Sequence, residues 1–262
     1  MHCWISKSKL GLLVVTALMM AAQLRAQDVK VMSSGGFAAA YKMLGPQFEK
    51  AAGTHLDSIW GPSMGTTAGA IPVRLARGES ADVVIMVRSA LDALVKKGYV
   101  EPDSVVDLAR SPIGMAVKAG APVPDISTVD KLRKVLLKAH SVAYSDSASG
   151  VYIQAHLFRK LGIEDQMKSK SHMIPATPVG EIVARGQAQI GFQQISELKP
   201  IPGITIVGPI PQQVQSITVF SAGIVKKGPD QKSARDLVEF LASPDACNTI
   251  KQTGLDPVAC TR

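Results

Sequence analysis

The chain has 262 residues and a formal net charge of +8, with 29 basic against 21 acidic side chains. Apolar residues make up 46% and charged residues 19%, which excludes a disordered tail, a collagen-like repeat and a disulfide-dense mini-protein. The length allows one large α/β domain or two lobes. Excess base often indicates nucleic-acid binding, but no basic stripe interleaved with aromatic residues occurs, so no nucleic-acid partner is expected.

The N-terminus has the pattern of an export signal. Lys7 and Lys9 precede an apolar run over residues 10–22, and small residues follow it. We expect cleavage after Ala22, or alternatively after Ala26, and therefore a periplasmic protein. Because the run is shorter than the roughly 20 apolar residues of a transmembrane helix, no membrane-spanning segment is expected.

Short β-branched runs then alternate with helical patterns along the chain, which predicts mostly parallel α/β structure. The expected strands cover residues 29–32, 55–60, 82–87, 114–118, 141–144, 173–174, 189–192, 205–207 and 216–225. The expected helices cover residues 37–51, 66–77, 89–97, 128–139, 150–161, 179–185, 230–242 and 244–252.

We interpret this series as two lobes with a ligand cleft between them. Chain crossovers are expected near residues 108 and 210. After the signal peptide, residues 1–22, the first lobe comprises residues 23–107 together with 211–262, and the second comprises residues 108–210. Cleavage leaves Cys247 and Cys260 as the cysteines, and an oxidising compartment favours a disulfide between them.

Three loops rich in glycine and hydroxyl residues follow predicted strands and precede predicted helices, at residues 33–36, 61–67 and 145–150. Since a helix N-terminus presents free backbone N–H groups, the three together favour a small-anion site. Routine capping would explain any one of them alone. No P-loop or dinucleotide fingerprint is present, which disfavours a nucleotide enzyme, and no cysteine or histidine cluster has zinc spacing.

Four segments carry a resemblance to a known family: VMSSGG at 31–36, LARGESADVVI at 75–85, SGVY at 149–152 and GQAQIGF at 186–192. With them, nearly all of the mature chain resembles the molybdate-binding-like branch of the type 2 periplasmic solute-binding proteins. The resemblance implies a two-lobed α/β fold whose ligand lies between the lobes.

The chain departs from the molybdate-binding pattern at the ligand positions. The family's serine, tyrosine and aspartate are replaced by Gly36, by the segment 191–194 and by Arg88. An arginine can bind a carboxylate with two parallel hydrogen bonds, and Gln193 and Gln194 can satisfy its oxygens. The departures therefore favour an organic polycarboxylate over a tetrahedral oxyanion.

Within the family, the length, the signal peptide and these substitutions are most similar to those of members that interconvert trans- and cis-aconitate. The resemblance implies an isomerase that moves a C=C bond in a small tricarboxylate by a 1,3-allylic proton shift, with neither a metal nor an organic cofactor. The alternative is a solute-binding component of an ABC importer for an oxyanion or a carboxylate, which would need a permease partner.

Candidate site residues follow from the loops and from these departures. The base needs a tunable pKa and access to the cleft, and Asp146, Tyr144, Tyr152 and Glu181 are candidates, although capping, packing or a helix-dipole role would also explain each of them. Substrate contacts are expected from Ser33, Ser34, Gly35, Ser63, Thr66, Thr67, Arg74, Arg88, Ser147, Ser149, Gln193 and Gln194.

Overall fold

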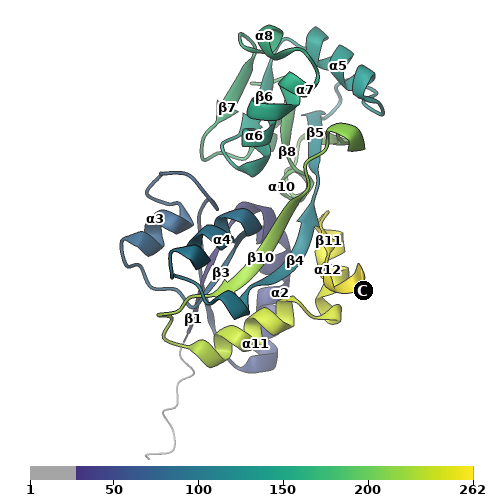
Figure 1. Ribbon diagram of the computed structural model, residues 1–262. Coiled ribbons are helices and arrows are strands. Elements are labelled where there is room, and N and C mark those ends of the chain that lie inside the picture. Colours follow the sequence, from purple (N-terminus) through teal and green to yellow (C-terminus); the bar gives the residue numbers. More distant parts are fainter. Residues whose placement is uncertain (1–27, 262) are drawn as a thin grey trace, which may run out of the picture.

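The computed structural model describes residues 28–261, which form two halves, each built on its own sheet (Figure 1). The predicted signal peptide, with either cleavage site, lies outside the described residues. Among residues 28–261, no helix is long and apolar enough to cross a membrane.

The first half contains a six-stranded sheet in the order β11-β4-β10-β3-β1-β2. Strands β1, β2 and β3 are parallel, and β10 runs antiparallel between β3 and β4. The strands are β1 (Val29–Ser33), β2 (Leu56–Trp60), β3 (Val83–Val87), β4 (Val106–Ser111), β10 (Thr218–Ile224) and β11 (Asp256–Pro257). The helices are α2 (Gly35–Ala52), α3 (Ile71–Ala76), α4 (Arg88–Lys96), η1 (Pro102–Ser104), α11 (Gln231–Leu241), η4 (Pro244–Ala246), α12 (Cys247–Gln252) and η5 (Ala259–Thr261).

The second half contains a five-stranded sheet in the order β7-β6-β8-β5-β9. Strands β6, β7 and β8 are parallel, and β5 pairs antiparallel with β8 and β9. The strands are β5 (Ile113–Lys118), β6 (Val142–Ser145), β7 (Ser171–Ile174), β8 (Ile190–Gln194) and β9 (Ile204–Pro209). The helices are α5 (Val129–Lys138), α6 (Ala148–Tyr152), the π-helical turn η2 (Ile153–Leu157), α7 (Phe158–Lys160), α8 (Glu164–Met167), α9 (Val179–Ala184), α10 (Ile195–Leu198) and η3 (Gln212–Val214).

Each sheet has its own apolar core. In the first half, Phe37, Leu44 and Phe48 recur at helical spacing on α2 and pack in one buried cluster with the inner residues of β1 and β3. In the second half, Phe192 of β8 and Leu132 of α5 belong to a separate cluster. Two sheets, each with its own apolar clusters, form the two-lobed α/β architecture that the sequence predicts.

The first connection between the halves comes a few residues after the crossover that the sequence predicts near residue 108. Residue 108 falls inside β4, a strand that the sequence analysis missed, and the chain leaves the first sheet only after Ser111. Leu108 and Ala109 are buried in the first core, so this segment belongs to the first sheet. The return passes between the end of β9 and the start of β10, where residue 210 lies.

The predicted helix over residues 66–77 begins too early, because only Ile71–Ala76 are helical. Ala70, inside the predicted range, is the extended N-cap residue of α3 with a ψ of 135°, so the helix begins only after it, and Pro72 lies at the helix start, where proline is favoured. The loop that follows β2 therefore continues to Ala70 before α3 begins.

The C-terminal segment is tied to the first half. Cys247, the first residue of α12, forms a disulfide with Cys260, and their Cα atoms are 6.3 Å apart. Between them β11 pairs with β4, which places the last residues of the described chain against the first sheet.

Candidate active site

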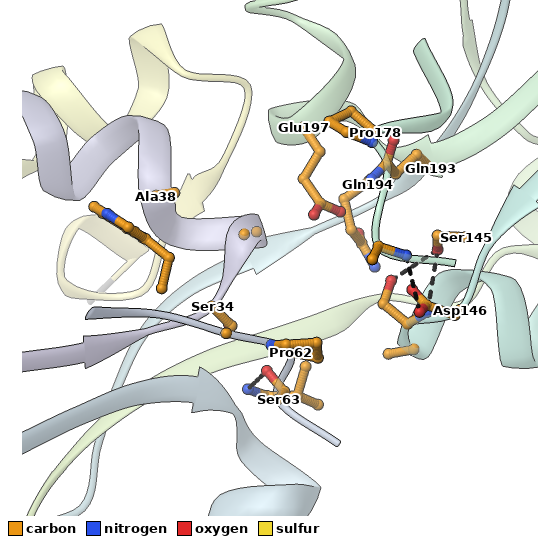
Figure 2. Close-up of a pocket in the computed structure, with 18 of the residues that line it drawn as sticks. Ser34, Ala38, Pro62, Ser63, Ser145, Asp146, Pro178, Gln193, Gln194 and Glu197 are labelled. Atoms are coloured by element: carbon orange, nitrogen blue, oxygen red, sulfur yellow. Dashed lines mark hydrogen bonds between the residues drawn. The ribbon is translucent and has the colours of Figure 1, made fainter. Parts of the chain in front are cut away.

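A pocket with a volume of about 340 Å³ lies between the two halves. Its walls come from the ends of β1, β2 and β3 on one side and from the ends of β6 and β8 on the other, which is where α/β sheets bind ligands (Figure 2). The lining residues are Ser34, Gly35, Gly36, Ala38, Lys42, Trp60, Gly61, Pro62, Ser63, Val87, Ser145, Asp146, Ser147, Ala148, Ala176, Thr177, Pro178, Gln193, Gln194, Glu197 and Phe220.

The start of α2 forms one wall. Ser34 is its N-cap residue, and its backbone N–H donates to the carbonyl of Ile85 at 2.9 Å, which fixes the loop on the sheet. The Ser34 Oγ is buried and has no hydrogen-bond partner within the described residues. No acidic residue lies in the first turn of α2, so this helix start suits an anion.

Ser63 holds the neighbouring loop in place. The Val87 N–H donates to Ser63 Oγ at 3.0 Å, which ties the loop after β2 to the end of β3. Pro62 and Ser63 lie opposite Ser145 and Asp146 across the pocket (Figure 2).

The start of α6 forms the opposite wall. Ser145 Oγ lies 2.7 Å from Ser147 Oγ and 3.0 Å from Ser149 Oγ, so three hydroxyls form one network at the helix start. Asp146 Oδ2 accepts a hydrogen bond from the N–H of Ala176 at 3.2 Å. Ala176 has a φ of 54°, the one non-glycine positive φ among residues 28–261.

Each of the two glutamines at the end of β8 has one atom of its side-chain amide held by a hydrogen bond. Gln193 Oε1 accepts from the Val179 N–H at 2.9 Å, and Gln194 Nε2 donates to Thr218 Oγ1 at 2.8 Å. Gln194 Oε1 is buried with no hydrogen-bond partner within the described residues. The pocket wall thus contains polar groups that a ligand can satisfy.

Glu197, which the sequence analysis missed, is the third residue of α10 and extends toward the pocket (Figure 2). Burial raises its pKa to about 7, and the negative charge of Asp146 adds to this rise. Hydrogen bonds with the Gln193 side chain and the Gln194 backbone act in the opposite direction. The carboxyl group is therefore divided between its acid and base forms near neutral pH. Its signal in the sequence was its place just after a strand end that carries two glutamines.

Lys42 is a second missed residue. Among the described residues that line the pocket, Lys42 alone carries a positive charge. Its Nζ lies 5.0 Å from the ring centroid of Trp60. Ala38 and Lys42 follow Ser34 at intervals of four residues, so helical spacing from the predicted loop could have indicated this position.

The structure brings seven of the predicted site residues together and leaves the other nine outside the pocket lining. Those in the lining are Ser34, Gly35, Ser63, Asp146, Ser147, Gln193 and Gln194. Those outside it are Ser33, Thr66, Thr67, Arg74, Arg88, Tyr144, Ser149, Tyr152 and Glu181.

The two predicted arginines are engaged elsewhere. Arg88, the first residue of α4, donates to Asp92 at 2.8 Å and to Asp107 at 2.7 Å. Arg74 donates to Glu79 Oε1 at 2.5 Å and to the carbonyl of Gly69 at 3.0 Å. Because acids in their own half neutralise both guanidinium groups, the prediction that they face the cleft is not supported by this geometry.

Three of the proposed bases have structural roles. Tyr144 is buried, and its ring packs edge-on against Phe158 at a centroid distance of 6.2 Å. The Tyr152 hydroxyl donates to the Val214 carbonyl at 2.7 Å. Glu181 pairs with Arg185 at 2.6 Å. Asp146 is the one predicted base that lines the pocket.

The remaining predicted contacts lie behind or beside the pocket. Ser33 is buried in β1, and Ser149 is the buried member of the Ser145 hydroxyl network. Thr66 and Thr67 are exposed in the long loop before α3, since the predicted helix does not begin there. Within residues 28–261, no three His, Cys, Asp or Glu side chains are grouped so that they could hold a metal ion.

The family of the chain follows from a match that covers almost all of the described residues. Residues 29–256 match the family model described as bacterial extracellular solute-binding protein. The chain belongs to this family. The resemblance to periplasmic solute-binding proteins predicted from the sequence is thus confirmed.

Two relatives show where the chain lies within the solute-binding family. It is 51% identical over 249 residues to a protein of a Pseudomonas species named aconitate isomerase, with 95% of each chain covered. It is 26% identical to the molybdate-binding protein ModA of Azotobacter vinelandii, which covers 90% of this chain and 92% of the relative.

Solved structures support the same solute-binding fold. The periplasmic molybdate-binding protein of Azotobacter vinelandii superposes with a TM-score of 0.70 at 20% identity, over 87% of this chain and 98% of the other. The predicted two-lobed fold is confirmed.

Proposed function

We propose that this chain interconverts trans- and cis-aconitate by a 1,3-allylic proton shift in the pocket between its two halves. The observation that carries the proposal is a titratable carboxyl group, Glu197, in a pocket otherwise suited to anions. A solute-binding site needs the anion donors alone, whereas proton transfer also needs a group that exchanges its proton near neutral pH. We take aconitate as the substrate because the relative that is 51% identical is named aconitate isomerase.

The pocket offers what a tricarboxylate requires. The helix starts at Ser34 and Ser147 present backbone N–H groups and hydroxyls, and Lys42 supplies a full positive charge. When a methylene proton leaves, negative charge spreads through the C=C bond into a conjugated carboxylate. Donors that already face that carboxylate stabilise this charge without reorganisation.

The proposed setting is the periplasm, with the protein exported by the signal peptide at its N-terminus. Membership of the extracellular solute-binding family supports export. In this setting the partner is a small tricarboxylate, and neither a permease nor a nucleic acid is required.

A second function, ligand delivery to an ABC importer, is favoured by the family itself and by the molybdate-binding relative. The ligand would then be an oxyanion or a carboxylate that leaves the pocket unchanged. The pocket donors serve binding equally well, so fold alone does not separate the two functions.

Incubation with trans-aconitate in D₂O, followed by NMR, distinguishes isomerisation from binding. We expect cis-aconitate to accumulate far beyond the amount of protein and both isomers to approach the same ratio from either side. Calorimetry with molybdate and trans-aconitate serves as the control. Saturable binding of trans-aconitate without any product would contradict the isomerase and support the importer component.

A further inference from the structure

We propose that Glu197 is the base that removes the allylic proton and the acid that returns it. This assignment rests on the proposed isomerase function. The first observation is position: Glu197 belongs to α10 of the second half, yet its carboxyl group lies against the start of α2 in the first half. A Cβ atom placed on Gly35 would lie 2.5 Å from Glu197 Oε1.

This contact places the base beside the expected anion site. Ser34 Oγ and the first N–H groups of α2 are the donors to which a substrate carboxylate would bind. A carboxylate held there brings its neighbouring carbon atoms next to Gly35, and Gly35 touches the Glu197 carboxyl group. Glycine at position 35 is what leaves room for the carboxyl group.

Glu197 is also free of the ion pairs that engage other carboxylates. Among the ion pairs of residues 28–261, Glu197 takes no part, whereas Glu181, at the same third position of its own short helix, is held by Arg185. The charged groups that share the pocket with Glu197 are Asp146 and Lys42. Because no ion pair stabilises the charged form of Glu197, its carboxylate remains able to accept a proton from the substrate.

The acid–base balance supports the same role. Burial and the charge of Asp146 raise the pKa of Glu197 to about 7, so the group can accept a proton in one step and release it in the next.

The isomerisation consists of two proton transfers. The Glu197 carboxylate takes one methylene proton, the C–H bond breaks, and its electron pair moves into the adjacent C–C bond while the old double bond passes its electrons to the conjugated carboxylate. The protonated Glu197 then delivers a proton to the other end of the allylic unit. A new C–H bond forms, the C=C bond has moved by one position, and Glu197 is again a carboxylate.

The test compares Glu197→Gln with Glu181→Gln as the matched control. Glutamine keeps the shape of the side chain but cannot accept the proton, so we expect kcat to fall by about 100-fold or more. Substrate affinity measured by calorimetry should stay within a few-fold, and deuterium uptake into the methylene position should be lost. The Glu181→Gln variant should retain the wild-type kcat.

The outcomes separate this inference from the proposed function. If the wild-type protein shows no turnover, the isomerase function fails. If the wild type turns over and Glu197→Gln does so equally, Glu197 is not the base. Should Glu197→Gln fail to fold, Glu197→Asp takes its place, with kcat expected to fall while the acid limb of the pH profile persists.

The pH profile supplies a readout that a merely structural role would not change. Because the base must be unprotonated, kcat/KM should rise with pH through about 7 and then level off. Replacing Asp146 by Asn removes a charge that raises the pKa of Glu197, so the rise should move to lower pH. An unchanged midpoint in Asp146→Asn would overturn the assignment of this limb to Glu197.

Discussion

Ser34 Oγ and Gln194 Oε1 are buried in the pocket wall and lack a hydrogen-bond partner among the described residues. A buried polar group left unsatisfied costs about 1–3 kcal/mol, so both atoms favour a ligand that pairs with them. Rotation of the Gln194 amide would let Thr218 donate to the oxygen and turn the NH₂ group toward the pocket. The site can thereby present a donor to a carboxylate.

Lys42 gives a direct test of charge recognition at the residue scale. We expect Lys42→Ala to raise the KM for trans-aconitate about 10-fold, because a charge-assisted hydrogen bond contributes about 1.5–3 kcal/mol. Steady-state kinetics measure this effect.

Arg88→Ala is the control, since Asp92 and Asp107 hold that arginine outside the pocket. Its KM should change less than about 2-fold. A larger effect of Arg88→Ala than of Lys42→Ala would contradict the pocket geometry.

Arg88 and Lys42 show that the sequence alone does not reveal which basic side chain faces the pocket. Arg88 directly follows a buried strand, as a ligand-binding residue does, but the acids that neutralise it lie four and nineteen positions away. Which charges pair depends on packing between elements. The predicted residues that line the pocket, such as Ser34 and Gln193, lie at strand ends, where the direction of the chain determines their place.

At the scale of elements, strands with continuous β-branched residues and long amphipathic helices were predictable. Strand β3 is buried at all five positions, and α2 has apolar residues at helical spacing. Helix α10 has four residues, too few for a periodic pattern, and the sequence analysis therefore missed Glu197 within it. The loop after β2 was misjudged because the backbone is still extended at Ala70, so the helix begins later than predicted.

The disulfide at α12 leads to a prediction at this scale. It closes a segment with a sequence separation of 13, and such a loop constrains the unfolded chain by about 3 kcal/mol. Cys260→Ser should therefore lower the free energy of unfolding by about 2–3 kcal/mol in urea titrations.

Reductant provides the internal control for this disulfide. It should destabilise the wild-type protein to a similar extent and leave Cys260→Ser unchanged. Equal urea midpoints for the wild type and the variant would show that the disulfide contributes nothing to stability. Since α12 does not line the pocket, kcat should stay at the wild-type value.

At the scale of the whole molecule, the net charge of +8 is better explained by small-anion binding than by nucleic-acid binding. Two of the excess charges, Lys7 and Lys9, lie in the predicted signal peptide, so the exported chain would have +6. Among the residues that line the pocket, one carries a positive charge. We therefore expect the surplus charge to act at long range, by attracting a small anion toward the molecule.

Ionic strength tests this long-range attraction. We expect KM for trans-aconitate to rise several-fold between about 0.01 and 0.15 M salt, because the screening length falls from about 30 to 8 Å. Much of this salt dependence should remain in Lys42→Ala, since the charge outside the pocket is unchanged. A KM independent of salt would contradict the role of the net charge.

The sheet order has a consequence for how the polypeptide folds. Strands β5 to β9 come from one continuous stretch, so the second half can complete its sheet by itself. Strand β10 lies between β3 and β4, yet it follows both of them by more than a hundred residues. The first half must therefore keep a central place open until the chain returns, and such distant pairing is slow. Because the walls of the pocket come from both halves, we expect the pocket to form only after β10 has paired with β3 and β4.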